Sequence, residues 1–443
     1  IVNLDVTPGF ANATPVVANS PHGSLTGASY PDSLIAGNKH AFQPRVGLSW
    51  RPFMASSMVI RAGYGIAYDT NVYFGVAARM AQQSPLSKTL SLANTLANPL
   101  TLASGFNAPP NTLTNTFAVD PNLRLGYAQN WQVTLQRDLP GALVMTAMYQ
   151  GIKGTHAMQQ ILPQTFPTGG TPYCSSCPKG YAYLVSGGNS TRQSGSMMLR
   201  RRLHNGFTAS LNYTYSKSID DAALAGQGQG GSLIAQNWLD LEAERALSNF
   251  DQRHLLQLNG QYTSGMGLKG GTLMNGWKGP LLKDWTFAST LNLGSGKPLN
   301  PFYSVLAAGS GVSGTIRPDY TGADLYAAPN GRFLNPAAFV AAGCAFVSPC
   351  PATGTGKFGN AGRNSITGPR TFVLNASLAR TFRMSDRLNA DLRFDANNVL
   401  NHVVMTSWVT NISSRDQFGL PSFGLPSAFQ QMRSMNMTLR VRF

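Results

Sequence analysis

The last nine residues of the chain, 435–443, constrain its fold more than any other segment. Apolar and polar side chains alternate strictly there, and the polar set includes Arg440 and Arg442. Successive side chains of a strand point to opposite faces, so this segment is predicted to form a strand with one apolar face and one cationic face. That pattern, ending on the apolar aromatic Phe443, is typical of the closing strand of a transmembrane β-barrel.

The same alternation recurs along the chain. Ten further segments show it, at 45–51, 59–68, 127–137, 142–150, 195–203, 207–216, 252–262, 285–293, 371–382 and 388–397. With the terminal strand they predict eleven strands and an all-β fold. The sequence has no run of 18 or more apolar residues that could form a membrane-spanning helix. If the chain crosses a membrane, it must therefore do so with β-strands.

The connections between these strands fall into two classes. The tight ones are Pro52 to Ser57, Pro140-Gly141, His204 to Gly206 and Arg383 to Asp386, with 264–282 as a longer exception. The long ones are 69–126, 151–194, 217–251, 294–370 and 398–433. Tight turns on one rim and long loops on the other describe an outer-membrane barrel with short periplasmic turns and long extracellular loops, provided that Phe443 lies on the periplasmic side.

Counting strands back from the C-terminus gives the predicted domains. Residues 1–42 would be the remnant of an extracellular loop, and residues 43–443 the C-terminal portion of the barrel. Bacterial single-chain barrels have even strand numbers, so an odd count of eleven predicts further strands upstream. Ile1 is not an initiator methionine and no signal peptide precedes it, so we expect the chain to be a fragment.

The two faces of the predicted strands differ in polarity. One face, expected to meet lipid, carries Val46, Leu48, Trp50, Ile60, Tyr64, Ile66, Trp131, Val133 and Leu135. The lumen-facing candidates on the other face are Arg45, Arg51, Arg61, Arg200, Arg202, Arg253, Asp391, Arg393, Asp395, Arg440 and Arg442, together with Gln132, Gln136, Gln257 and Asn259. An arginine facing lipid at mid-bilayer costs about 2–4 kcal/mol, so Arg201 and Arg380, which fall on the apolar register, are expected near a membrane edge.

The charge of the predicted interior has two interpretations. The chain has a formal net charge of +16, from 34 basic and 18 acidic residues. Dispersed arginines inside a barrel can attract an anionic solute or a plug domain, or they can neutralise nearby acids, as Asp391 and Asp395 beside Arg393 indicate. The basic residues form no long run apart from Arg200–Arg202, so nucleic acid is not an expected partner.

No pattern in the sequence predicts catalysis, a cofactor site or a metal site. The glycine-lysine segments at 294–297 and 354–357 lack the Ser or Thr that a phosphate-binding loop requires after its lysine. Six scattered histidines show no metal-ligand spacing. The four cysteines, Cys174, Cys177, Cys344 and Cys350, form two close pairs that could hold zinc or act as a redox couple. The export route is oxidising, so we expect two local disulfides, 174–177 and 344–350.

Several segments together resemble the Oar-like TonB-dependent outer-membrane receptors. They include FQPRVGLSWRPF, NWQVTLQRDLPGALVMTAMYQGIKGTH, ALSNFDQRHLLQLNGQY, FGNAGRNSITGPRTFVLNASL and RLNADLRFDANNVLNH. The resemblance implies a bacterial outer-membrane location and a 22-stranded barrel filled by an N-terminal plug. It also implies a TonB-contacting segment ahead of the residues present here. The implied partners are outer-membrane lipid, the TonB complex, the barrel-assembly machinery and an unidentified solute. The assembly signal would be Met437, Leu439, Val441 and Phe443.

Three functional hypotheses follow, none of them enzymatic. The first is the barrel portion of a TonB-dependent transporter or receptor for a large solute. Its candidates for first contact are the loop aromatics Tyr73, Phe74, Tyr181, Tyr183, Trp238 and Tyr303, which could instead pack loop against loop. The second is an outer-membrane anchor that presents adhesive or structural loops. The third, a soluble secreted β-protein, conflicts with a continuous apolar strand face.

Overall fold

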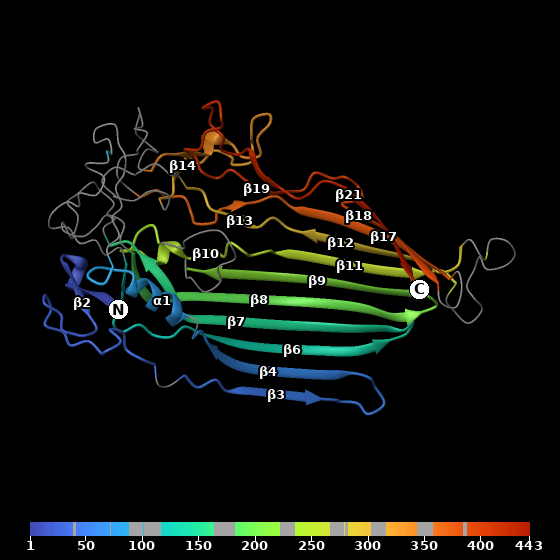
Figure 1. Ribbon diagram of the computed structural model, residues 1–443, viewed down its shortest axis with the longest axis horizontal. Helices are drawn as coiled ribbons and strands as arrows, with labels where there is room; N and C mark the ends of the chain where they lie inside the picture. The colour runs from blue at the N-terminus through green and yellow to red at the C-terminus, as the bar shows by residue number, and fades with distance from the viewer. Residues whose placement is uncertain are drawn as a thin grey trace.

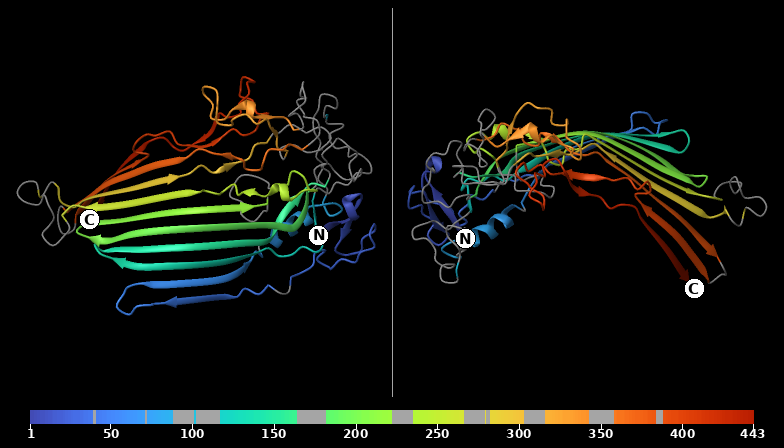
Figure 2. Two further views of the ribbon diagram at one scale, coloured as in Figure 1. Left: turned by 180° about the vertical axis from the view of Figure 1, so that it is seen from behind. Right: turned by 90° about the horizontal axis from the view of Figure 1, so that it is seen from above.

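The computed structural model describes residues 1–38, 41–70, 72–87, 101, 117–163, 182–221, 235–265, 279, 282–302, 316–342, 358–383 and 388–443. A curved antiparallel sheet dominates it, with consecutive strands side by side (Figures 1 and 2). Eleven strands form its main path: β3 (Arg45–Trp50), β4 (Val59–Tyr68), β6 (Tyr127–Leu139), β7 (Leu143–Ile161), β8 (Ala182–His204), β9 (Phe207–Asp220), β11 (His254–Thr263), β12 (Trp285–Gly294), β17 (Thr371–Arg383), β18 (Asn389–Asn397) and β21 (Ser434–Arg442). Strands β3 and β21 are the edges of this path. None of the helices in the described part of the chain is long and apolar enough to cross a membrane.

The eleven strands are the eleven that the alternation predicts, and the tight connections lie where the turn residues predict them. Asn205 and Gly206 join β8 to β9 with φ of 52° and 77°. Gly141 and Ala142 join β6 to β7 with φ of 77° and 62°. Positive φ at consecutive residues gives a turn whose twist matches the flanking strands, so the chain reverses over two or three residues.

The prediction of a long loop over 151–194 is wrong at both of its ends. Strand β7 continues to Ile161 and β8 begins at Ala182, so these strands have 19 and 23 residues. Crossing a membrane takes about 9–11 residues, so both strands extend well past the others at the long-loop end. The predicted loop starting at 217 is likewise shorter, because β9 runs to Asp220 and β10 (Ala246–Leu247) pairs with its end.

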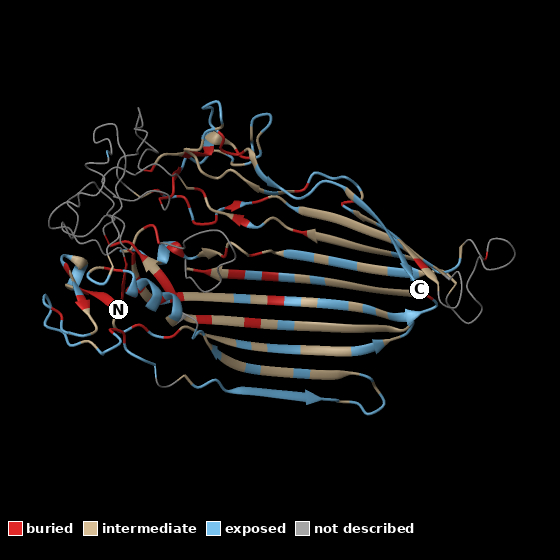
Figure 3. Cartoon of the chain, in the orientation of Figure 1, coloured by how far each residue is buried: buried red, intermediate tan, exposed pale blue. Residues whose placement is uncertain are grey.

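A packed core lies at the long-loop end rather than within the sheet (Figure 3). We call it the loop cap: residues 1–35, α1 (Val72–Ala81), residues 117–125 and the far ends of β7 and β8. Its elements include β1 (Val2–Val6), η1 (Pro8–Phe10), β2 (Ala13–Val17) and β5 (Phe117–Val119), which pairs in parallel with β8. Its buried side chains include Val16, Leu34, Val76, Met80, Phe117, Val119, Met158, Leu162 and Leu184.

A second group of loops packs at the same end. It contains η2 (Glu242–Glu244) and η3 (Pro336–Ala338). Its two-stranded pairs are β13 (Pro298–Leu299) with β16 (Ile366–Thr367), β14 (Asp319–Tyr320) with β15 (Phe339–Val340), and β19 (Met405–Trp408) with β20 (Pro426–Phe429). Its core is formed by Leu334, Ala338, Phe339, Ala361, Ile366 and Phe423. The described parts of the loops that join the strands are therefore folded around apolar interiors of their own.

The pairing register separates two faces of the main sheet. Val46, Tyr64 and Trp131 lie directly opposite one another on β3, β4 and β6, and further along these strands so do Leu48, Ala62 and Val133. We call the side that carries them the apolar face and the other side the polar face. Exposed large side chains of the apolar face include Leu258, Phe287, Leu378, Phe394, Met437 and Leu439. A continuous exposed apolar surface of this extent is what contact with lipid requires.

Candidate functional site

The polar face carries ion pairs near the short-turn end. Arg393 lies 2.8 Å from Asp395, and Arg442 lies 2.8 Å from Asp391. The hydroxyl of Thr381 also donates to Asp391. Further along the sheet Arg202 pairs with Asp138 at 3.0 Å. Local neutralisation, one of the two interpretations that the sequence leaves open, therefore accounts for several of the candidate residues.

Other arginines of the candidate set differ in their environment. Arg61 donates to Gln136 at 2.9 Å, and Arg51 donates to the carbonyl oxygens of Ser56 and Met54 within its turn. Arg253, just before β11, lies 3.7 Å from Asp251. Within the described residues, the guanidinium groups of Arg45 and Arg200 make no hydrogen bond or ion pair. Arg440 lies directly opposite Asp391 in the register. The polar face thus combines neutralised pairs with uncompensated positive charge.

Arg201 and Arg380, the arginines predicted to lie near a membrane edge, are both beside the short turns. Arg201 is close to the end of β8, and Arg380 lies opposite Trp285, the first residue of β12. Both stack on aromatic rings: Arg201 on Phe207 at 5.1 Å, and Arg380 on Phe382 at 4.6 Å. Their placement at strand ends agrees with the prediction, since an edge position lets the guanidinium reach the polar interface.

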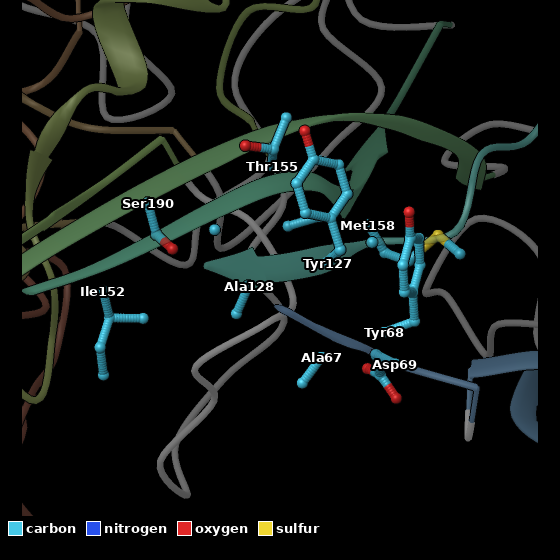
Figure 4. Close-up of a pocket in the computed structure, with 12 residues that line it drawn as sticks. Ala67, Tyr68, Asp69, Tyr127, Ala128, Ile152, Thr155, Met158 and Ser190 are labelled. Carbon is cyan, nitrogen blue, oxygen red and sulfur yellow. The ribbon is translucent and has the colours of Figure 1, made fainter. Parts of the chain in front are cut away.

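A cavity of about 450 Å³ lies where β4, β6, β7 and β8 approach the loop cap (Figure 4). Its walls are mostly small or apolar, and Asp69 and Ser190 contribute polar groups. In Figure 4, Ala67, Ala128 and Ile152 point away from the side on which Tyr68 and Tyr127 stand. This matches the register, in which Tyr68 lies opposite Tyr127. Residues from both faces of the sheet therefore line the cavity.

Buried polar contacts fix the N-terminal part of the loop cap. Asn3 bonds both backbone groups of Val119, and the Asp5 carboxylate accepts hydrogen bonds from Leu25, Thr26 and Tyr30. Burial acts to raise the pKa of Asp5, but these hydrogen bonds outweigh it and hold the pKa below its ordinary value of 3.8. The cap is therefore held by a charged group whose bonds require the ionised carboxylate.

A buried ion cluster joins the second group of loops to the sheet. Nη1 of Arg317 lies 2.9 Å from both carboxylate oxygens of Glu244, and Arg363 pairs with Asp220. Arg363 also donates to the backbone oxygen of Glu244 at 2.8 Å. The four side chains are between 1% and 5% exposed, and the two positive charges balance the two negative ones. Glu242 and Glu244 lie in the short helix η2, and no local sequence pattern pairs Glu244 with either arginine.

Comparison with known proteins identifies the family. The sequence profile of the family described as "Outer membrane beta barrel domain" matches residues 2–435. The chain belongs to this family. The protein is therefore located in the bacterial outer membrane, and the apolar face of its sheet is the surface that meets lipid. No curated protein matches it in sequence.

Solved structures similar to this barrel include outer-membrane transporters and receptors. The outer membrane transporter YddB from Escherichia coli matches with a TM-score of 0.48 and 12% identity, over 90% of this chain and 40% of that one. The ferripyoverdine receptor of Pseudomonas aeruginosa, bound to ferripyoverdine, matches with a TM-score of 0.39 and 11% identity, over 90% and 32%. The ferric citrate transporter FecA matches with a TM-score of 0.39 and 12% identity, over 90% and 38%. The barrel spans less than half the length of each of these chains.

The loop aromatics proposed for first contact have different surroundings. The ring of Phe10 packs edge-on against Tyr183 at 4.9 Å and Trp238 at 5.2 Å, so both of these side chains pack against η1 of the loop cap. Tyr183 lies in β8 rather than in a loop, and the hydroxyl of Tyr73 on α1 is buried. Phe74 on the same helix is 83% exposed and is the most open to solvent of the candidates that the structure describes. Tyr181, Tyr303 and all four cysteines lie outside the described residues.

Proposed function

We propose that this chain is the barrel portion of a TonB-dependent outer-membrane transporter or receptor for a large solute. The observation that carries the proposal is the polar face of a membrane β-sheet whose arginines are only partly neutralised, with a cavity at its loop end. A lumen that passes a solute needs a hydrated wall, and a wall lined by arginines favours anions. In this proposal Phe443 and the short turns face the periplasm, and the loop cap faces outward.

The proposal extends to the parts of the complete protein. Residues 1–42 would belong to an extracellular loop, and residues 43–443 to the C-terminal portion of a barrel of 22 strands. A plug and a TonB-contacting segment would come from the N-terminal regions, and the barrel-assembly machinery would read Met437, Leu439, Val441 and Phe443 on β21. The position of residues 1–35 in the loop cap supports the first of these assignments.

Uptake can be tested without knowing the solute. A strain that lacks the complete gene is compared with the same strain carrying it, and depletion of the growth medium is followed by mass spectrometry with and without a proton-motive-force uncoupler. Transport predicts at least one solute whose depletion requires both the gene and the proton-motive force. The alternative function, a surface anchor for adhesive loops, predicts no such solute and a loss of cell adhesion in the deletion strain.

A further inference from the structure

We propose that Arg200 and the row of neutral polar side chains beside it form a binding site for a carboxylate, sulfate or phosphate group of the solute. The inference deepens the proposed transport function by naming the chemical class of group that the inner wall binds. A cavity of about 230 Å³ on the main sheet is lined by residues from β8, β9, β11 and β12. It is separate from the larger cavity near the loop cap.

The register brings the donors of this site into one line. Arg200 lies opposite Ser210, Ser210 opposite Asn259, and Asn259 opposite Thr290. The Asn259 side-chain amide donates to the Ser210 hydroxyl at 3.4 Å and accepts from the Thr290 hydroxyl at 3.0 Å. Thr208 and Gln261, in the next row of the same face, also line the cavity. Hydroxyl, amide and guanidinium groups are the donors that bind oxyanions in proteins.

The charge balance around Arg200 leaves its guanidinium available to an anion. The nearest acid in the row of paired residues that contains Arg200 is Asp138. Val144 of β7 lies between them, so Asp138 and Arg200 are two strands, or about 10 Å, apart. Asp138 is already bonded to Arg202 at 3.0 Å. In the other direction the partners of this row on β9, β11, β12 and β17 are Ser210, Asn259, Thr290 and Asn375, all neutral. Arg393 and Arg442, by contrast, each have a carboxylate within 3 Å.

Direct binding of an anion tests the site. The complete protein in detergent is dialysed against radiolabelled sulfate, and then against inorganic phosphate, at low ionic strength. We expect one saturable site, with Arg200→Ala weakening binding about tenfold or more, since a charge-assisted pair is lost. Asn259→Ala should weaken binding severalfold without changing the charge of the protein. Arg45→Ala removes an unpaired arginine that lies outside this cavity, and it should leave binding unchanged.

Three results would overturn the proposal. The first is that Arg200→Ala binds sulfate and phosphate as tightly as the wild type. The second is that Arg45→Ala loses as much affinity as Arg200→Ala. The third is that the wild-type protein shows no saturable binding of either anion. Arg200→Lys keeps the charge and should retain part of the affinity, which separates a binding defect from a folding defect. The heat-modifiable migration of each variant on a gel reports whether the barrel has folded. Because this experiment measures binding, its result is independent of uptake. Anion binding without any gene-dependent solute depletion would support this site and refute transport.

Discussion

Replacing Glu244 by Gln should loosen the second group of loops while leaving the sheet intact. The Glu244 carboxylate accepts from Arg317 at 2.9 Å and from the backbone nitrogen of Gln236 at 2.8 Å, and it is 1% exposed. The amide of glutamine keeps the size of the side chain but removes its charge. Arg317, which is 5% exposed, would then keep only its bond to the Ala361 carbonyl oxygen as a charge-independent contact.

The expected magnitude follows from the burial of this pair. Removing one partner of a buried ion pair costs about 3–5 kcal/mol, because the other charge is left uncompensated. At about 1.4 kcal/mol per factor of ten, local opening of the loops should rise by about 10²- to 10⁴-fold. Hydrogen exchange followed by mass spectrometry on the complete protein in detergent measures this directly in peptides that cover 235–251, 316–342 and 358–370.

The matched control is Asp138→Asn, which breaks the ion pair with Arg202. Those side chains are 44% and 61% exposed, so the loss should be below about 1 kcal/mol and confined to the short-turn end of β6 and β8. Exchange in the three loop segments of the Glu244→Gln variant that stays within about threefold of wild type would refute the reasoning. It would mean that the apolar core around Leu334 and Phe339, rather than the ion cluster, holds these loops.

Three further predictions concern the two faces, the loop cap and the cysteines. Leu258 on the apolar face and Asn259 on the polar face are neighbours near the middle of β11. Leu258→Arg should therefore destabilise the barrel in lipid vesicles by about 2–4 kcal/mol, whereas Asn259→Arg should cost much less; equal urea midpoints would contradict the face assignment. Because the pKa of Asp5 is depressed in the folded cap, its stabilisation is present above the ordinary value of 3.8 and is lost as the pH falls below it. Amide protection of β1 and β2 should decline over that range in the wild type, and it should be low at neutral pH and insensitive to acid in Asp5→Asn. Finally, all four cysteines should resist alkylation until a reductant is added, and labelling of the unreduced protein would exclude the two disulfides.

The strands could be predicted from the sequence because the two faces of a membrane sheet contact different solvents. Leu256, Leu258 and Tyr262 face one way while Gln257, Asn259 and Gln261 face the other, so the period of two is present in the residues themselves. The tight turns could also be predicted, because they depend on local backbone preferences. Asn205-Gly206 adopts positive φ at little cost, and that preference is local to the two residues.

The ion pairs of the structure could be predicted only in part, because several of them join segments that are far apart in the sequence. Asp220 and Arg363 are 143 residues apart, and Glu244 and Arg317 are 73 apart. No local pattern records such a contact. The pairing of Arg393 with Asp395 was accessible because the two residues are two apart on one strand. The sequence did single out Arg200, but not the absence of acids around it, which depends on the register of the six strands β6, β7, β9, β11, β12 and β17.

The alternation fails at the point where strands β7 and β8 leave the predicted membrane layer. From the level of Leu143 and Arg201 to that of Lys153 and Thr191 the strands rise by about ten residues. That is about 33 Å along a strand, or about 25 Å along the membrane normal at a tilt of about 40°, which equals the height of the apolar band of such barrels. Lys153, on the apolar face, therefore lies at the upper edge of that band.

Beyond this level lipid no longer imposes a period of two. A β-bulge after Gly154 shifts the register, with His156 at a φ of 55°, and the consecutive residues Ala157, Met158 and Gln159 are all buried against neighbouring protein. A strand packed on both sides by protein has no reason to alternate. The segment that sequence reasoning assigned to a loop is therefore the part of the sheet that serves as the platform for the loop cap.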